Sequence, residues 1–266
     1  MVEAFRTRHE VFPLTHAEAD ITNPESLEAA FERIRPDLIV HPAGIPDLDI
    51  CDAEPERARL VNVRGTENVV EAARRVGAGL AHISTDAVFD GKKSTPYRET
   101  DATGPLTVYG ATKLQAEQAA ATLPRHWIFR VSVLFGPGKT NFIEKGLRKI
   151  AAGEQYRVAS DQVGSATHTV DAGMKIMEVV ERGPAGIYHL SNQGACSRLE
   201  LALRAAELAG LDAGKVVGVP DAQMGRRAPR LKYSVMEMDA LRHAGLVLPR
   251  PWPEALADYV RSLRFV

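Results

Sequence analysis

Hydrophobic positions follow two alternating patterns along the chain. Several short runs are almost wholly apolar, as expected of strands buried on both faces of a parallel sheet. Between these runs, apolar residues recur at helical spacing. Strand and helix alternating in this way predict an α/β protein with a Rossmann-like, doubly wound parallel sheet. The predicted strands are 38–43, 80–84, 127–135 and 187–191, and the predicted helices are 24–34, about 56–76, 109–123, 197–209 and 253–263.

The two ends of the chain depart from this regular pattern. Residues 2–8 have the pattern of the last part of a helix, residues 9–14 (HEVFPL) predict a short strand, and Asn23 is a candidate cap for the helix that follows. From about residue 191 onward, helices alternate with an Arg- and Pro-rich loop at 224–232. We expect this last part to form a small unit over the ends of the strands.

Composition narrows the function classes. The chain has 266 residues, is 45% hydrophobic and carries a net charge of −1, which argues against disorder and against binding to nucleic acid or an anionic membrane surface. No apolar run approaches the roughly 20 residues that span a bilayer. Cys51 and Cys196 lie far apart, and the eight histidines form no metal-binding spacing. We therefore expect a cytoplasmic protein without a metal site.

Candidate chemistry gathers where the predicted strands end. In doubly wound sheets, ligands bind outside the carboxyl ends of the strands. Ala43 and Gly44 follow the first buried run, Ser84, Thr85 and Asp86 follow the second, and residues 132–136 follow the third. The hydroxyl of Ser84 or Thr85 is placed to polarise a carbonyl oxygen, although strand-end hydroxyls often bond only to backbone groups.

Tyr109 and Lys113 are a candidate acid–base pair. They stand four residues apart at the start of a predicted helix and so share one face. An ammonium about 4 Å from a phenol contributes on the order of 4 kcal/mol at a surface-like dielectric. At about 1.36 kcal/mol per unit, this interaction would lower the pKa of Tyr109 from about 10 to roughly 7. The alternative is a helix-start tyrosine beside a solvated lysine.

Several longer segments carry a resemblance to a known family. They are ISTDAVFDG (83–91), PYRETD (96–101) and PLTVYGATKLQAE (105–117), together with PDLIVHPAG, DQVGSAT, GIYHLSNQG and RRAPRLKYS. Their order and spacing resemble those of dTDP-4-dehydrorhamnose reductases, which are extended short-chain dehydrogenases/reductases. The resemblance covers nearly the whole chain. It implies a Rossmann-like domain with a small C-terminal α/β substrate domain.

The resemblance implies a reaction and a role for each matching residue. The reaction is hydride transfer from NADPH or NADH to the 4-keto group of a nucleotide-activated deoxysugar. Tyr109 would be the acid, Lys113 would hold the nicotinamide ribose, and Thr85 would polarise the substrate carbonyl. The remaining implied residues are Ala43, Gly44, Ser84, Asp20 and Ile21 for the cofactor and Asp86, Asn141, Arg227 and Arg230 for the substrate.

The same resemblance implies how the chain divides. Residues 1–136 and about 165–190 would bind NAD(P), and about 137–164 and 191–266 would bind the sugar nucleotide. The segment Thr15-His16 contains neither an acid for the ribose hydroxyl of NADH nor an arginine for the 2′-phosphate of NADPH, so the sequence does not decide between the two cofactors. A homodimer is the default expectation.

Two features depart from the family pattern. The first glycine of the chain is Gly44, so about 20 residues that would carry the first strand and its glycine-rich turn are expected to be missing. Either the start is misassigned, or the chain has lost cofactor binding. In the substrate pocket, Ala87 and Val133 stand where the family has tyrosine and tryptophan, and Ala166 replaces a proline.

Other functions stay open at this point. A non-catalytic regulatory protein is one, because the β-subunit of methionine adenosyltransferase belongs to the same structural group. The missing glycine-rich turn favours it, whereas intact Thr85, Tyr109 and Lys113 favour a reductase. Sugar-nucleotide dehydratases place an acidic pair directly after the threonine, and here Ala87 follows Asp86. Epimerases need tightly held NAD, which the missing turn disfavours.

Overall fold

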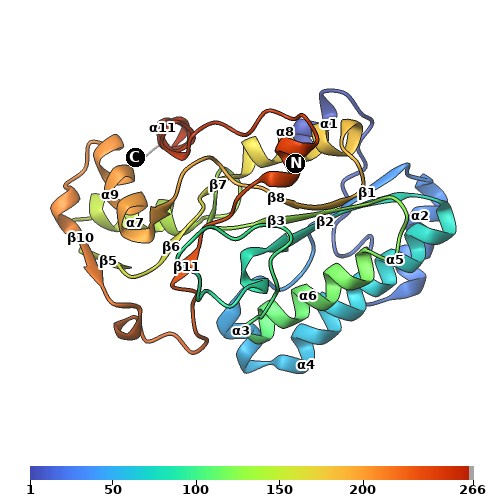
Figure 1. Cartoon of the computed structure of the whole chain (residues 1–266), viewed down its shortest axis with the longest axis horizontal. Helices are drawn as coiled ribbons and strands as arrows, with labels where there is room; N and C mark the ends of the chain where they lie inside the picture. Colours follow the sequence, from blue (N-terminus) through green and yellow to red (C-terminus); the bar gives the residue numbers. More distant parts are fainter. Residues whose placement is uncertain (264–266) are drawn as a thin grey trace.

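The main sheet of the protein is parallel, as the sequence predicts. The computed structural model describes residues 1–263, and its main sheet has the strand order β1-β2-β3-β8. All three neighbouring pairs in it are parallel, and each strand coincides with a predicted apolar run, which confirms the α/β class (Figure 1). The strands are β1 (Leu38–His41), β2 (Gly79–Thr85), β3 (His126–Val131) and β8 (Gly186–His189).

Helices cover both faces of this sheet. Leu80 and Ile128 belong to the core beneath α2, α5 and α6, whereas Ala81 and Phe129 belong to the core beneath α1, α8 and α10. Successive residues of a strand point to opposite faces, so one apolar run supplies both cores. The helices are α2 (Pro24–Ile34), α5 (Gly65–Val76) and α6 (Val108–Ala120) on one face, and α1 (Val2–Arg6), α8 (Thr169–Arg182) and α10 (Asp239–His243) on the other.

The long helix predicted for 56–76 contains an irregular middle. It runs through α4 (Pro55–Ala58), the π-helical turn η1 (Arg59–Arg64) and α5 without leaving helical conformation. Single π-turns inside helices often mark functional sites, because they turn one side chain out of the regular ladder. Here the turn contains the buried Asn62.

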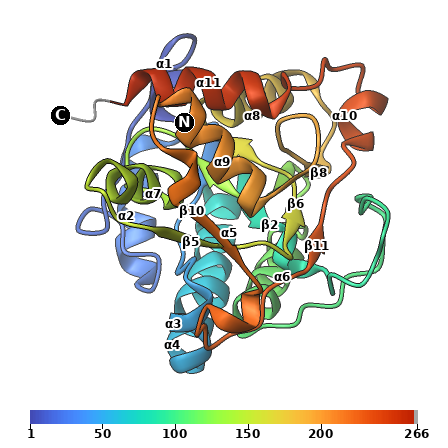
Figure 2. The same ribbon diagram turned by 90° about the vertical axis from the view of Figure 1, so that its left-hand side faces the viewer.

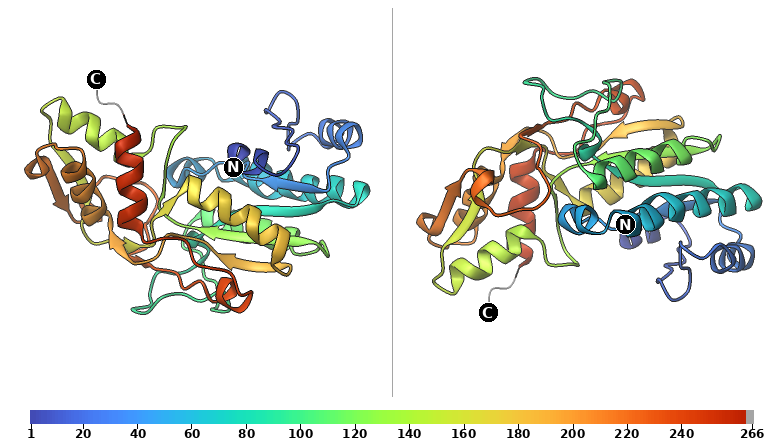
Figure 3. Two further views of the ribbon diagram at one scale, coloured as in Figure 1. Left: turned by 90° about the horizontal axis from the view of Figure 1, so that it is seen from above. Right: turned by 90° about the horizontal axis from the view of Figure 1, so that it is seen from below.

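Further strands and helices lie beyond the carboxyl ends of the main strands. Figures 2 and 3 show this second group beside the main sheet, and it encloses a separate apolar core. Its strands are β5 (Tyr156–Ala159) with β10 (Val216–Val219), and β6 (Val163–Gly164) between β9 (Cys196–Ser197) and β11 (Tyr233–Ser234). Its helices are α7 (Phe142–Ala151), α9 (Arg198–Leu208) and α11 (Trp252–Ser262).

Short elements complete the described chain. They are α3 (Leu48–Ala53), the 3-10 turns η2 (Asp86–Val88), η3 (Ala213–Lys215) and η4 (Asp221–Gln223), and the strand pair β4 (Leu134–Phe135) with β7 (Thr167–His168). None of the helices described is both long and apolar enough to cross a membrane.

The strand predicted for residues 9–14 is wrong. These residues form neither a helix nor a strand. β1 is the edge of the main sheet, so the described chain offers no neighbouring strand to which this segment could bond. Pro13 also lacks the N–H that a central strand would donate. By contrast, Asn23 caps α2 as predicted, because its side chain accepts the backbone N–H groups of Glu25 and Ser26.

Candidate active site

The carboxyl end of β2 gathers the first polar groups of the site. Thr85 ends the strand, and its hydroxyl accepts the backbone N–H of Ala87 at 3.1 Å and donates to Asp86 Oδ1 at 3.1 Å. Ser132, just beyond β3, donates to the other oxygen of Asp86 at 2.5 Å. Because β2 and β3 are parallel, their carboxyl ends meet at one edge and bring these side chains together.

Tyr109 reaches the same place from the start of α6. Thr107 caps this helix through the N–H of Gly110. A β-carbon added at Gly110 would lie 2.1 Å from the carbonyl oxygen of Ala87, so only glycine lets α6 approach the turn after β2 so closely. That approach brings the Tyr109 phenol close to the Thr85 hydroxyl, which acts on its pKa.

The charge state of Tyr109 differs from the sequence-based prediction. Burial raises the pKa of its phenol above the ordinary value, and the hydrogen bond with Thr85 offsets only part of this effect. Lys113 does not lower the pKa of Tyr109 here, because its ammonium bonds to His82 and to the carbonyl oxygen of Ile83 on β2. The predicted value of roughly 7 is therefore wrong for this conformation, and Tyr109 is a neutral phenol that carries its proton.

Lys113 is held by β2. Its Nζ lies 3.0 Å from His82 Nε2 and donates to the carbonyl oxygen of Ile83 at 2.7 Å. One helical turn further, Glu117 accepts the hydroxyl of Ser84 at 2.5 Å. Four residues of helix rise about 6 Å and two residues of strand about 6.6 Å, so this spacing on α6 matches the spacing on β2. Burial lowers the pKa of Lys113 to about 8.

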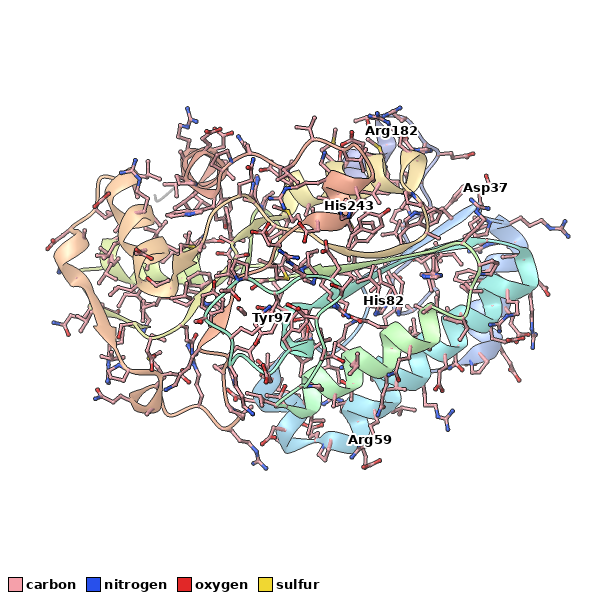
Figure 4. All side chains as sticks on the ribbon, viewed as in Figure 1. Asp37, Arg59, His82, Tyr97, Arg182 and His243 are labelled. Atoms are coloured by element: carbon pink, nitrogen blue, oxygen red, sulfur yellow. The ribbon has the colours of Figure 1, made fainter. Side chains whose placement is uncertain are left out.

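Two histidines continue this polar core. His82 lies near the middle of the molecule beside α6, and its ring centroid is 5.2 Å from that of His41 (Figure 4). Burial lowers the pKa of His41 to about 3 and that of His82 well below its ordinary value, so both rings are neutral. His82 Nε2 therefore accepts a hydrogen bond from the Lys113 ammonium. Its Nδ1 is buried without a hydrogen-bond partner in the described chain.

Asn62 joins the loop after β1 to the helix that carries Tyr109. Its amide accepts the N–H of Ile45 at 2.7 Å and donates to the carbonyl oxygen of Ile45 and to the hydroxyl of Thr112 on α6. A β-carbon at Gly44 would lie 2.9 Å from Asn62 Oδ1. Sequence reasoning missed Asn62 as a site residue. The only signal in the sequence is the stretch VNVRGT (61–66), whose role the π-turn reveals.

The other residues expected at the cofactor lie along the same face. Ala43 and Gly44 are exposed directly after β1. Asp20 uses one oxygen to accept the N–H and the hydroxyl of Thr22, which shapes the turn before α2. Ile21 packs against Gly65 of α5, where an added β-carbon would lie 2.7 Å from the isoleucine side chain.

The residues expected at the substrate are engaged in contacts of their own. Asn141 caps α7, and its amide donates to Tyr259 at 2.6 Å. Arg227 pairs with Asp52 at 3.1 Å. Arg230 pairs with Asp49 at 3.1 Å. These two ion pairs hold the loop 224–232 against α3, although the two segments lie far apart in the sequence. The acidic partners on α3 also offset the positive charge that the loop was expected to offer to a substrate.

The three positions that depart from the family pattern differ in their surroundings. Ala87 and Ala166 are buried. Val133 has a positive φ of 42°, in the left-handed region that β-branched residues rarely adopt. Such strain is concentrated at functional sites, where the surrounding structure enforces it. Here the carbonyl of Val133 accepts the N–H of Thr167 at 3.1 Å, which ties the strained turn to β7.

These residues fit the nicotinamide end of a dinucleotide. The backbone just after the exposed Ala43–Gly44 bonds to Asn62, which also bonds to Thr112 on α6. On the same helix Lys113 lies beside His82, whose Nδ1 is buried without a partner in the described chain. Within residues 1–263, no three His, Cys, Asp or Glu side chains are placed to hold a metal ion.

Known proteins share both the sequence and the fold. SpsK, a spore coat polysaccharide biosynthesis protein of Bacillus subtilis, is 37% identical over 96% of this chain and 89% of its own length. The dTDP-4-dehydrorhamnose reductase of Mycolicibacterium smegmatis is 36% identical over 96% of this chain and 79% of its own length. The crystal structure of dTDP-4-dehydrorhamnose reductase from Bacillus anthracis in complex with NADP superposes with a TM-score of 0.93 at 32% identity, covering 97% of this chain and 92% of that one.

A family model extends the match to nearly every residue. The model described as the RmlD substrate binding domain matches residues 1–265. Dehydratases and epimerases of nucleotide sugars share the architecture at lower identity, for example a UDP-glucose 4-epimerase from Thermotoga maritima at 19% identity with a TM-score of 0.80, which shows a common fold only. The chain belongs to the RmlD substrate binding domain family, the family of the dTDP-4-dehydrorhamnose reductases.

Proposed function

We propose that this protein reduces the 4-keto group of a nucleotide-activated deoxysugar with NADPH or NADH. The observation that carries the proposal is the approach of a neutral Tyr109 phenol to the buried Thr85 at the carboxyl end of β2. Several relatives named as dTDP-sugar 4-ketoreductases support it, and so does the NADP bound to the Bacillus anthracis reductase.

The proposed chemistry uses the proton that Tyr109 retains. The Thr85 hydroxyl and the Tyr109 phenol both address the substrate's carbonyl oxygen, which gains negative charge as the carbonyl is reduced. A bound NADPH supplies the hydride. Tyr109 donates its proton to that oxygen, and a high pKa keeps this proton in place until the oxygen becomes basic.

Lys113 acts in this scheme through its position. Its ammonium is held by His82 and Ile83 in the structure, and we propose that it turns toward the cofactor ribose when a dinucleotide is bound. Lys113 is buried, and Nδ1 of His82 is buried without a hydrogen-bond partner in the described chain. Buried polar groups normally have such partners, so both observations support the binding of a polar ligand here.

The proposed division of labour follows the two groups of secondary structure. The parallel sheet, residues 1–136 and about 165–190, would bind the cofactor. The smaller sheets and their helices, about 137–164 and 191–266, would bind the sugar nucleotide. We also propose that the protein is a cytoplasmic homodimer, which sedimentation in solution would check.

The test compares three forms of the protein in a coupled assay. The wild type is given NADPH or NADH with dTDP-4-keto-6-deoxysugars, and nucleotide oxidation is followed at saturating substrate. Tyr109→Phe removes the acid and is expected to lower kcat by 10²- to 10⁴-fold. Thr85→Val removes the polarising hydroxyl and is expected to lower kcat without changing the binding of NADPH.

Two outcomes would contradict the proposal. One is a wild-type protein that binds neither nucleotide, which would favour a regulatory protein without catalytic activity. The other is a Tyr109→Phe variant that retains wild-type kcat, which would show that the acid is another group. Conserved thermal stability of both variants is the control that the substitutions act on chemistry.

A further inference from the structure

Arg198, the first residue of α9, stands out among the arginines of the second group of elements. Its guanidinium lies over the ring of Phe142, with Cζ 5.1 Å from the ring centroid. Within residues 1–263 this guanidinium has neither an ion pair nor a side-chain hydrogen bond, whereas nearby Arg226 pairs with Asp221 at 2.9 Å. On the same helix, Arg204 pairs with Glu207 at 2.9 Å.

The surroundings of Arg198 withdraw it from water. Its residue is only partly exposed, and burial lowers the pKa of the guanidinium, the largest effect on it. A desolvated cation without a partner is costly, and such groups persist in proteins where a ligand or another charge compensates them. An arginine in this state is poised for an anion.

The strand pairing places Arg198 beside the candidate active site. β9 runs antiparallel to β6, with Cys196 opposite Gly164, and the backbone N–H of Arg198 donates to the carbonyl oxygen of Gln162. A β-carbon at Gly164 would lie 3.5 Å from the hydroxyl of Ser132, the residue that donates to Asp86. Arg198 is therefore one strand removed from the carboxyl ends of β2 and β3.

Charges of both signs surround Arg198. Asp86 is the acidic side chain whose charge acts most strongly on this guanidinium, and it already accepts hydrogen bonds from Ser132 and Thr85. Arg226 adds a second positive charge nearby. The phenol of Tyr156 donates to the carbonyl oxygen of Phe142 at 2.9 Å, which holds in place the backbone of the residue on which Arg198 stacks.

We propose that Arg198 binds the diphosphate of the nucleotide sugar, where the small sheet meets the carboxyl ends of the parallel strands. This inference rests on the proposed function. Guanidinium groups present a planar fork that matches phosphate oxygens in two parallel hydrogen bonds, and stacking on Phe142 holds the fork in one plane. Arg227 and Arg230 do not fill this role, because Asp52 and Asp49 pair with them.

The test measures the binding of dTDP and of thymidine by calorimetry. Arg198→Met keeps a flexible side chain over Phe142 and removes the charge, and Arg198→Lys keeps the charge and removes the fork. Arg204→Met, the same substitution on the outer face of α9, is the matched control. We expect Arg198→Met to weaken dTDP binding about 10- to 100-fold and Arg198→Lys to weaken it less. Thymidine, which lacks phosphate, should bind the wild type and all three variants equally.

The outcomes separate this inference from the proposed function. If the wild type binds dTDP and reduces the keto sugar, but Arg198→Met binds dTDP within twofold of wild type, the inference is overturned and the reductase stands. If Arg198→Met loses NADPH binding and keeps dTDP binding, Arg198 serves the dinucleotide and the inference is again overturned. A wild type that binds neither dTDP nor NADPH would overturn both. Equal melting temperatures of the variants exclude a loss of fold.

Discussion

The buried ion pair between α6 and β3 gives the sharpest stability prediction. Arg130 Nη2 lies 2.7 Å from Glu117 Oε2, and both side chains are 4% exposed. Glu117 also accepts the hydroxyl of Ser84, and the Arg130 guanidinium lies over the ring of Phe89. This pair ties the helix that carries Tyr109 to the sheet. Arg130→Met would leave the carboxylate of Glu117 buried with a single hydroxyl as its partner.

The size of the effect follows from this burial. Breaking a buried pair by removing one partner costs about 3–5 kcal/mol, because the remaining charge is uncompensated. At about 2–4 °C per kcal/mol for a chain of this size, Arg130→Met is expected to lower Tm by roughly 6–20 °C. Replacing both members, in Glu117→Leu with Arg130→Met, removes the orphaned charge and is expected to recover most of the loss.

Circular dichroism during heating and in urea measures these changes. The control is Arg148→Met, which breaks a pair with Glu144 at the surface, where the arginine is 64% exposed, and is expected to cost less than about 1 kcal/mol. The reasoning is refuted if Arg130→Met lowers Tm no more than Arg148→Met does. It is also refuted if the double variant loses the full sum of the two single losses.

Three further predictions concern packing, pH and the loop over the site. Gly110→Ala puts a β-carbon 2.1 Å from the carbonyl oxygen of Ala87, so we expect the free energy of unfolding measured in urea to fall by about 1–3 kcal/mol. Because the clash displaces Tyr109, we also expect a roughly 100-fold loss of kcat. His41 stays neutral in the folded protein down to about pH 3, whereas in the unfolded chain it binds a proton below about pH 6.5. The free energy of unfolding measured in urea should therefore fall as pH decreases between these values, by up to about 1.36 kcal/mol per pH unit. His41→Asn should reduce that slope. Asp49→Ala removes one of the two ion pairs that hold the loop 224–232 against α3 and should lower Tm by about 2–4 °C.

Each of these predictions has a matched control. Gly173→Ala, in α8, meets only the chain start and Ala4 at 3.3 Å or more, and should leave kcat unchanged. His16→Gln, at a side chain 83% exposed, should leave the pH slope unchanged. Equal slopes for His41→Asn and wild type, unchanged kcat in Gly110→Ala, or an unchanged Tm in Asp49→Ala would each contradict the corresponding argument.

Local signals in the sequence determined the elements of this protein. The apolar runs mark the strands because a strand buried on both faces needs apolar side chains on both. Asn23 marks the start of α2 because a cap bonds to backbone groups two and three residues away. Tyr109 and Lys113 share one face of α6 because the helical period is local, and the ordered motifs around them identify the family.

Tertiary structure alone decided what those residues contact. The spacing of Tyr109 and Lys113 suggested a lowered phenol pKa, but His82 and the carbonyl of Ile83 draw the ammonium into the core. Which strand residue meets which helix residue depends on how two distant segments pack, and no local pattern records it. Arg198 shows the same limit. Its place over Phe142, without an ion pair within residues 1–263, depends on the pairing of β9 with β6, which joins segments more than 30 residues apart.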